Sequence, residues 1–423
     1  MKRVLTIMLL PLLALSVFAT GAKETRTVEL WHSNTGKVGE AFENIINDFN
    51  ETVGKENGVY VEAIYQGKAN DVLTKVKASS GANTLPDIAQ MDATSGLDMN
   101  NADYIVTIDE LGLDTSSVLE IAKTGFKSER GLIALPFNSS ALLLYYNKTL
   151  FDSLGLVPPK TMDEMVDVAN ALKGKIDYAF AGVPATSELT TFLGAQNSIS
   201  YMTDNENGHK GKATKVLFGE NGTYKAFLEK WKAIYETGSV NNITQGVSTE
   251  FAASRCAMML ASSSNLSTII ANVDNTFEVG VAEVPMVDEN ATGGVCVGGG
   301  ALYAFENNED VKLVLEYLTS ADVQLKWAEG TGYIPLNTKL YDSEEYKAFL
   351  SLNPNFSIAM DAILKSNPQL TNVWLPSAYQ IYYSFQENIN GAITGKKTID
   401  KSVDDMTSVI EGALKDYAKQ NSN

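Results

Sequence analysis

The segment from residue 28 to residue 91 alternates between short β-branched or aromatic runs and amphipathic stretches, and this alternation limits the fold more than any other feature. Residues 28–31, 59–65 and 87–91 have the composition of strands. A strand, helix, strand, helix, strand order implies a parallel sheet with helices packed on it. The two helical faces that separate the strands comprise Phe42, Ile45, Ile46 and Phe49, then Val72, Leu73 and Val76.

The ends of these predicted strands carry polar and aromatic residues. Residues 31–33 lie at the carboxyl end of the first strand, and residues 90–94 lie at the carboxyl end of the third. In open α/β sheets ligands bind beyond the carboxyl ends of the strands. The sequence therefore predicts a ligand site at this edge of the sheet.

Further elements follow along the 423 residues, a length typical of two to three domains. Thr161 and Glu164 form a capping box that opens a helix. Trp231 and Trp327 lie on apolar helical faces, so we assign them to the core. A C-terminal amphipathic helix is marked by Ile399, Val403, Met406 and Ile410.

The N-terminal segment has the pattern of a secretory signal peptide. A basic start at residues 1–3 precedes an apolar run that ends at residue 19. We predict cleavage after Ala19, with Ala22 as the alternative. The run is too short for a comfortable membrane span, and no cysteine follows it to carry a lipid anchor. We therefore expect an exported protein, in a periplasm or at the extracellular face of the cell membrane.

Charge and residue counts exclude several functional classes. The net charge of −18 argues against nucleic acid and anionic membranes as partners. The only histidines are His32 and His209, too few for most His-rich zinc sites and unfavourable for a Ser-His-Asp triad. The only cysteines are Cys256 and Cys296, which leaves one bridge or two buried thiols open. We expect no metal ion and no cofactor.

Motifs for other chemistries are incomplete. The glycine-rich residues 293–300 lack the Lys-Ser/Thr of a P-loop and do not follow the first strand of the sheet. Their glycines instead suit close backbone approach to a ligand, or a hinge crossing. Residues 205–208 faintly resemble a calcium loop, but Thr203 would occupy its first position without a carboxylate. Any two of the many carboxylates could in principle form a glycosidase pair, but the sequence gives no reason to choose one. An exported glycan-active hydrolase is therefore kept only as an alternative.

Hydroxyl and aromatic side chains are concentrated in the predicted loops. Aromatic faces stack on the C–H faces of sugars and polyols, and hydroxyls, amides and glycine N–H groups hydrogen-bond to their OH groups. As a set these residues favour binding over catalysis, and we expect no enzyme activity. The set comprises Trp31, Ser139, Ser140, Ser262, Ser263, Ser264, Tyr333, Trp374, Tyr379, Tyr382 and Tyr383.

A series of sequence blocks in a fixed order resembles a known family. The chain is similar to the extracellular solute-binding protein family 1, the substrate-binding components of carbohydrate-type ABC importers. Within the family it most resembles the subgroup that binds sn-glycerol 3-phosphate. The blocks are residues 31–33, 137–140, 145–148, 158–161, 256–258, 261–263, 298–299, 331–335 and 394–397.

The resemblance implies pocket residues position by position. Two pocket serines of the subgroup match Ser140 and Ser262, its pocket glycine matches Gly299, and a pocket tyrosine matches Tyr333. With the loop residues above, the predicted ligand-binding set is Trp31, His32, Asp92, Ser140, Ser262, Gly299, Tyr333, Trp374 and Tyr382. We expect Tyr333→Ala and Trp374→Ala to weaken binding without unfolding the protein.

Three positions depart from the subgroup pattern. A subgroup tyrosine falls on Ala69, and a subgroup glutamate falls on Ala93, where the adjacent Asp92 can substitute after a one-residue shift. The subgroup's C-terminal arginine aligns with Tyr382, which cannot make the bidentate charged contact of a guanidinium with phosphate. We therefore favour a neutral saccharide or polyol, with sn-glycerol 3-phosphate or a glycerophosphodiester as the alternative.

The resemblance also implies an α/β, two-lobed periplasmic binding protein fold of type II. Each lobe is expected to be a mainly parallel sheet flanked by helices, with the ligand cleft between the lobes. Residues 1–19 are then the signal peptide, residues 23–137 plus 296–329 are lobe 1, and residues 138–295 plus 330–423 are lobe 2. Crossings between the lobes are expected near residues 136–140, 295–300 and 330–333.

The implied mechanism is hinge closure around a small carbohydrate or polyol, which is then delivered to the transmembrane subunits of an ABC permease. ATP hydrolysis would belong to a separate subunit. We expect a monomer that makes and breaks no covalent bond. Besides the hydrolase, an adhesin or chemoreceptor partner that uses the same fold to present a surface remains an alternative.

Overall fold

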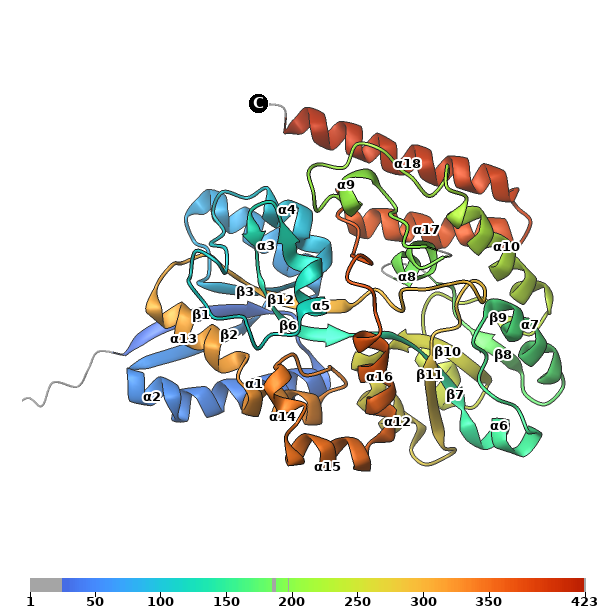
Figure 1. Cartoon of the computed structure of the whole chain (residues 1–423), viewed down its shortest axis with the longest axis horizontal. Helices are drawn as coiled ribbons and strands as arrows, with labels where there is room; N and C mark the ends of the chain where they lie inside the picture. The colour runs from blue at the N-terminus through green and yellow to red at the C-terminus, as the bar shows by residue number, and fades with distance from the viewer. Residues whose placement is uncertain (1–24, 185–187, 197, 422–423) are drawn as a thin grey trace, which may run out of the picture.

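The computed structural model describes residues 25–184, 188–196 and 198–421. The predicted signal peptide, residues 1–19, lies outside this range. Two five-stranded sheets lie side by side, each with helices packed around it (Figure 1). We call each sheet with its helices a lobe. The expected two-lobed α/β architecture is confirmed.

The first sheet has the strand order β2-β1-β3-β12-β6. Strand β1 pairs in parallel with both β2 and β3, and helix α1 (Gly36–Glu51) buries its predicted apolar face. The predicted alternation of strands and helices up to residue 91 is therefore confirmed, with α3 (Ala69–Ala82) as the second helix. The strands are β1 (Arg26–His32), β2 (Val59–Tyr65), β3 (Ile88–Asp92), β6 (Leu135–Ser140) and β12 (Gly298–Ala304).

The second sheet has the strand order β11-β7-β10-β8-β9. Its parallel pairs are β10 with β8 and β8 with β9, and its antiparallel pairs are β10 with β7 and β11 with β7. The strands are β7 (Leu142–Asn147), β8 (Tyr178–Ala181), β9 (Val240–Asn241), β10 (Cys256–Ser262) and β11 (Val279–Glu283).

Neither sheet is mainly parallel, which differs from our expectation. In the first sheet β12 pairs antiparallel with β3 and with β6, so parallel and antiparallel pairings are equal in number. The reason is that β6 and β12 belong to segments that pass between the lobes. These strands enter the sheet in the direction that the crossing imposes, not through a helix crossover.

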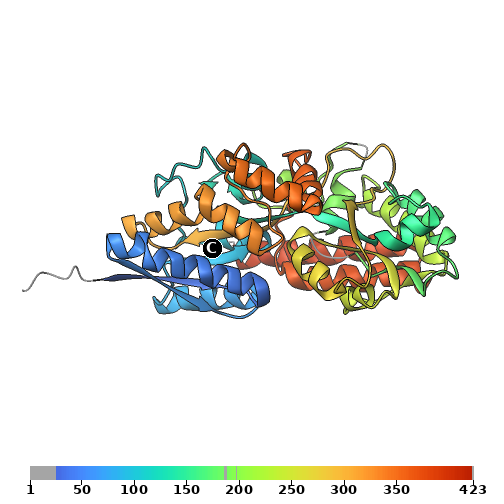
Figure 2. The same ribbon diagram turned by 90° about the horizontal axis from the view of Figure 1, so that it is seen from below.

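Helices cover both faces of the first sheet (Figure 2). Those of the first lobe are α1, α2 (Val53–Asn57), α3, α4 (Gly96–Asn100), α5 (Glu120–Lys123), α13 (Glu309–Leu318) and α14 (Ala321–Gly330), and the short strands β4 (Lys127–Ser128) and β5 (Gly131–Leu132) form a hairpin. Helix α15 (Glu344–Leu352) follows. The remaining helices are α6 (Lys148–Leu154), α7 (Met162–Ala171), α8 (Glu188–Gly194), α9 (Asp204–Asn207), α10 (Thr223–Glu236), α11 (Val247–Ala252), α12 (Leu266–Val273), α16 (Pro354–Leu364), α17 (Ala378–Ile393) and α18 (Ile399–Gln420).

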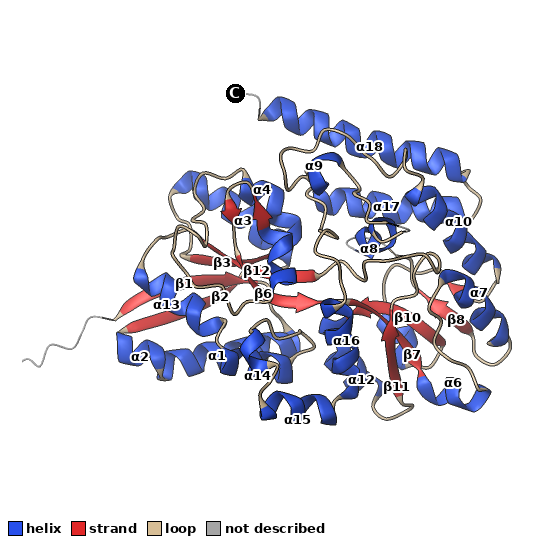
Figure 3. Ribbon diagram, viewed as in Figure 1, coloured by secondary structure: helices blue, strands red, loops and turns tan. Residues whose placement is uncertain are grey.

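Helices α17 and α18 pack on each other and on α10 of the second lobe (Figure 3). The last part of α18 reaches the first lobe, where Asn101 Nδ2 donates to Tyr417 OH at 2.9 Å. The predicted C-terminal helix is confirmed as α18, which buries Val403, Met406 and Ile410. The predicted cap of α7 is also confirmed, because Thr161 Oγ1 accepts a hydrogen bond from Glu164 N. None of the helices in the described ranges combines the length and the hydrophobicity of a bilayer-spanning segment.

Two of the expected crossings coincide with strand boundaries. Only Ala141 separates β6 of the first sheet from β7 of the second. The chain returns between the end of β11 and Gly298, where β12 begins. The first crossing is a single residue and the second ends where β12 begins, so the end of β6 and the start of β12 lie at the boundary between the lobes.

The third crossing was expected at residues 330–333, and this is wrong. The loop there touches the second lobe, since Ser267 Oγ donates to Thr331 O at 2.8 Å. The chain then returns to the first lobe, where Leu119 N donates to Leu336 O and Thr338 N donates to Ser117 O, both at 2.8 Å. Packing against the second sheet begins only at α16.

The cores contain the two tryptophans assigned to them. Trp231 packs edge-on against Phe180, with ring centroids 5.4 Å apart, and Trp327 stacks on Tyr333 at 5.5 Å. Both tryptophans are buried. Cys256 and Cys296 are buried free thiols, so of the two alternatives the structure has the unbridged one.

Candidate ligand-binding site

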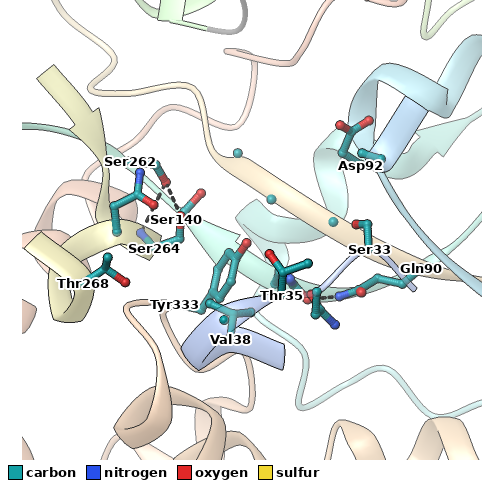
Figure 4. Close-up of a pocket in the computed structure, with 18 of the residues that line it drawn as sticks. Ser33, Thr35, Val38, Gln90, Asp92, Ser140, Ser262, Ser264, Thr268 and Tyr333 are labelled. Carbon is teal, nitrogen blue, oxygen red and sulfur yellow. Dashed lines mark hydrogen bonds between the residues drawn. The ribbon is translucent and has the colours of Figure 1, made fainter. Parts of the chain in front are cut away.

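A cavity of about 780 Å³ lies between the lobes, at the carboxyl ends of β1 and β3, where the sequence predicts a site. Its first-lobe wall follows β1 and β3, and its opposite wall comes from the end of β10 and from α12 (Figure 4). The floor is formed by the crossing strands β6 and β12. Hydroxyl and amide groups dominate the lining, which includes Ser33, Asn34, Thr35, Gln90, Thr94, Asn138, Ser140, Ser262, Ser264, Asn265, Thr268, Asn272 and Asn372.

Six of the nine predicted ligand-binding residues line this cavity: Asp92, Ser140, Ser262, Gly299, Tyr333 and Tyr382. They come from β3, β6, β10, β12, the loop after α14, and α17. The fold thus brings together residues that are up to 290 positions apart in the sequence. Their contact with a ligand remains a prediction.

Trp31, His32 and Trp374 are absent from the cavity lining, and we withdraw them from the site. Trp31 is 8% exposed and donates its indole N–H to Glu29. His32 packs on Phe42 with ring centroids 4.9 Å apart. Trp374 is completely buried, and its side chain serves the core. Aromatic rings of this kind can stack on a sugar, but these three side chains are buried in the core and do not reach the cavity wall.

The burial of His32 makes stability depend on pH. Asn34 N donates to His32 Nδ1 at 3.3 Å, and desolvation lowers the pKa of His32 to about 4. The unfolded chain has a histidine pKa of about 6.5 and binds the proton first, so stability falls as the pH drops from about 6.5 to 4. We expect His32→Gln to flatten this decline in urea unfolding at pH 7.5, 6 and 5. Parallel pH profiles for variant and wild type would contradict this assignment.

The serine wall is built by hydrogen bonds around the end of β10. Ser262 Oγ lies 2.9 Å from Ser264 Oγ, and Tyr145 OH donates to the Ser262 carbonyl at 3.0 Å. Ser263 is buried, and its hydroxyl accepts from Ala141 N in the crossing. Ser262 and Ser264 therefore face the cavity from a fixed backbone (Figure 4).

Gly299 has a conformation that only glycine fits well. Its φ is +125°, and a Cβ atom there would lie 1.7 Å from the carbonyl oxygen of Asn138. The glycine run was expected to allow close approach to a ligand or a hinge crossing. The structure shows close approach to the neighbouring crossing strand β6.

Asp92 is the acidic residue of the cavity wall. Its carboxyl group accepts hydrogen bonds from the backbone N–H and hydroxyl of Thr94, and from Tyr379 OH at 2.8 Å. Because burial penalises the charged form, the pKa of Asp92 is raised despite these bonds. Tyr379 belongs to α17, so this hydrogen bond joins the two lobes.

Several lining residues were missed by the sequence reasoning. Asn34, Thr35 and Lys37 surround the start of α1, and Lys37 is the one cation among the described lining residues. Thr268 and Asn272 lie on one face of α12, together with Ala271. Their i, i+3, i+4 spacing on a helix after a predicted pocket serine is a signal that could have found them. Within the described residues no cluster of three or more His, Cys, Asp or Glu side chains is arranged to hold a metal ion.

The chain is similar to a known protein family and to relatives within it. A family model described as bacterial extracellular solute-binding protein matches residues 44–352. Curated relatives include the sn-glycerol-3-phosphate-binding periplasmic protein UgpB of Rhizobium meliloti (strain 1021), 26% identical and covering 94% of this chain and 96% of the relative. The same-named protein of Pectobacterium atrosepticum is 25% identical over 92% of each chain.

Solved structures share the fold over nearly the whole length. The GacH receptor of Streptomyces glaucescens GLA.O, studied with acarbose, has a TM-score of 0.77 at 19% identity and covers 93% of this chain and 99% of its own. UgpB from Mycobacterium tuberculosis, in complex with glycerophosphocholine, has a TM-score of 0.76 at 20% identity. The match covers 92% of this chain and 99% of that protein.

Proposed function

This chain belongs to the bacterial extracellular solute-binding proteins, and from that membership we propose that it is the substrate-binding component of a carbohydrate-type ABC importer. It captures a sugar or polyol by closure of the lobes and delivers it to the transmembrane subunits of the permease. It acts as a monomer in a periplasm or at the extracellular face of the membrane. The description of the family as extracellular and the periplasmic relatives support this location.

One observation carries the proposal: a cavity of about 780 Å³ lined by hydroxyls and amides from both lobes. A solute in this position hydrogen-bonds to Ser262 and Ser264 on one side and to the β3 wall on the other. A ligand that contacts both walls binds the closed form more tightly than the open form. This difference in affinity drives closure.

A neutral ligand fits the charges of the cavity better than a phosphate does. Tyr382 lines the wall at the position where the subgroup has arginine, and Asp92 contributes a carboxyl group. Lys37, in the first turn of α1, is exposed and is the one described cation at the cavity. The alternative ligand, sn-glycerol 3-phosphate or a glycerophosphodiester, would need Lys37 to hold its phosphate.

The hydrolase alternative lacks support in the cavity. Glycosidases use two carboxyl groups roughly 5–9.5 Å apart on either side of the scissile bond. Asp92 is the single carboxylate among the described residues that line the cavity. We therefore propose binding without chemical conversion, and unchanged ligand after prolonged incubation is the expected result.

Calorimetric titration of the chain without its predicted signal peptide tests the proposal. The panel holds D-glucose, maltose, sorbitol, glycerol, sn-glycerol 3-phosphate and glycerophosphocholine. Tight binding of a neutral member, one per chain, is expected. Failure of every member to bind, or turnover of a member, would contradict the proposal.

Lys37→Gln separates the two ligand classes. With a neutral ligand we expect the dissociation constant to change less than about twofold, because no charged contact is lost. A loss of tenfold or more would show a charge-assisted contact with an anion and would favour the alternative. Lys55→Gln on α2, an exposed lysine absent from the cavity lining, is the matched control.

A further inference from the structure

Gln90 has a buried amide with one unused atom at the cavity wall. Its side chain is 3% exposed, and its Nε2 donates to Asn138 Oδ1 at 2.8 Å (Figure 4). Its Oε1 is buried and has no hydrogen-bond partner in the described part of the chain. A buried acceptor left without a donor costs about 1–3 kcal/mol, so its retention beside a cavity points to a donor from outside the chain.

The strand register explains how Gln90 reaches this position. Gln90 and Asp92 are two apart on β3, so both side chains point to the same face of the sheet. Strand β12 separates β3 from β6, and its Gly300 lies opposite both Asp92 and Asn138. Because Gly300 has no side chain, the amide of Gln90 can cross β12 and contact Asn138. The absence of a side chain at Gly300 thus leaves the β3 wall, which carries Gln90 and Asp92, uncovered.

This wall offers hydrogen-bond acceptors. Besides Gln90 Oε1, it carries the carboxyl group of Asp92, which accepts hydrogen bonds from Thr94 and Tyr379. An anionic group placed here would meet these acceptors, and neither Gln90 nor Asp92 offers it a positive charge. A hydroxyl group supplies the donor that Gln90 lacks.

We propose that Gln90 is a specificity-determining residue that accepts a hydrogen bond from a hydroxyl group of the ligand. The proposal deepens the function above and rests on it. The hydrogen bond to Gln90 orients the ligand. A hydroxyl group of the ligand faces the β3 wall, and any acidic group points away from that wall. The same contact applies to a saccharide, a polyol or the glycerol moiety of a glycerophosphate, because each has free hydroxyls.

The test compares two buried glutamines by Gln90→Met and Gln324→Met. Gln324 is completely buried, but both amide atoms are paired, with Leu318 O at 3.1 Å and Leu336 N at 2.7 Å. Gln90→Met removes the unpaired acceptor together with one hydrogen bond, the one to Asn138, so we expect a smaller drop in melting temperature than for Gln324→Met and a tenfold or larger loss of affinity for the panel member that binds. Gln324→Met should lower the melting temperature and leave the affinity of the folded protein within about twofold.

The opposite pattern would overturn the proposal. If Gln90→Met binds the same panel member within twofold of the wild type, then Gln90 only joins β3 to β6. If no panel member binds the wild type, the proposed function fails, and the role of Gln90 fails with it. These two failures are distinguished by the wild-type titration alone.

Discussion

Replacing Tyr379 with phenylalanine is expected to weaken ligand binding by about tenfold to a hundredfold, although Tyr379 does not line the cavity. Its hydroxyl donates to Asp92 Oδ2 at 2.8 Å and so links α17 of the second lobe to β3 of the first. A hydrogen bond contributes about 1.5–3 kcal/mol when one partner is charged, as Asp92 is above its raised pKa, and each 1.4 kcal/mol changes an equilibrium tenfold. Loss of a bond between the lobes shifts the protein toward the open form, and apparent affinity falls with the closed fraction.

The shift can be measured without a ligand. Cys256 and Cys296 are buried, so spin labels can be placed on cysteines introduced at exposed Glu43 and Glu229, one in each lobe. We expect Tyr379→Phe to move the distance distribution away from that of the wild type. Tyr383→Phe, on the same helix but 70% exposed, is the control and should leave it unchanged. Identical distributions for all three proteins would show that this bond does not hold the lobes together.

Trp374→Ala is expected to destabilise the fold by about 3–5 kcal/mol, the cost typical of a large-to-small aromatic change in a core. The indole is completely buried and stacks on His209, with ring centroids 4.0 Å apart. Gly96 packs so closely that a Cβ atom there would lie 2.2 Å from Trp374 Nε1. This result replaces our initial expectation that the variant would lose only ligand binding.

Urea unfolding of Trp374→Ala beside Tyr383→Ala provides the measurement. The exposed Tyr383 should tolerate alanine within about 0.5 kcal/mol. If Trp374→Ala unfolds like the wild type and yet binds ligand weakly, the indole must contact the ligand, and its assignment to the core is wrong.

Much of the fold followed from local patterns. The apolar face of α1 and the strand composition of β1, β2 and β3 depend on residues close in sequence, and periodicity describes them well. The antiparallel strands β6 and β12 could not be found in this way. Their direction is set by where the chain re-enters the first sheet, which is a property of the whole topology.

The site was partly predictable, and the misses have physical causes. Residue type marked Trp374 as a sugar platform, but its burial depends on His209, which lies 165 positions earlier in the sequence. Thr268 and Asn272 look like an ordinary helix surface until α12 is placed opposite β3. The contact between Asp92 and Tyr379 joins two lobes, and no local pattern predicts it.

The central claim is that a small hydroxylated solute binds in the cavity between the lobes. Thr268 is exposed on α12 and lines the cavity, whereas Ile270, on the same helix and 43% exposed, does not. The most direct measurement is calorimetric titration of the wild type, Thr268→Trp and Ile270→Trp with the neutral panel member that binds. We predict one ligand per chain for the wild type and Ile270→Trp, and at least hundredfold weaker binding for Thr268→Trp. Equal affinity in all three would place the ligand elsewhere and contradict the account.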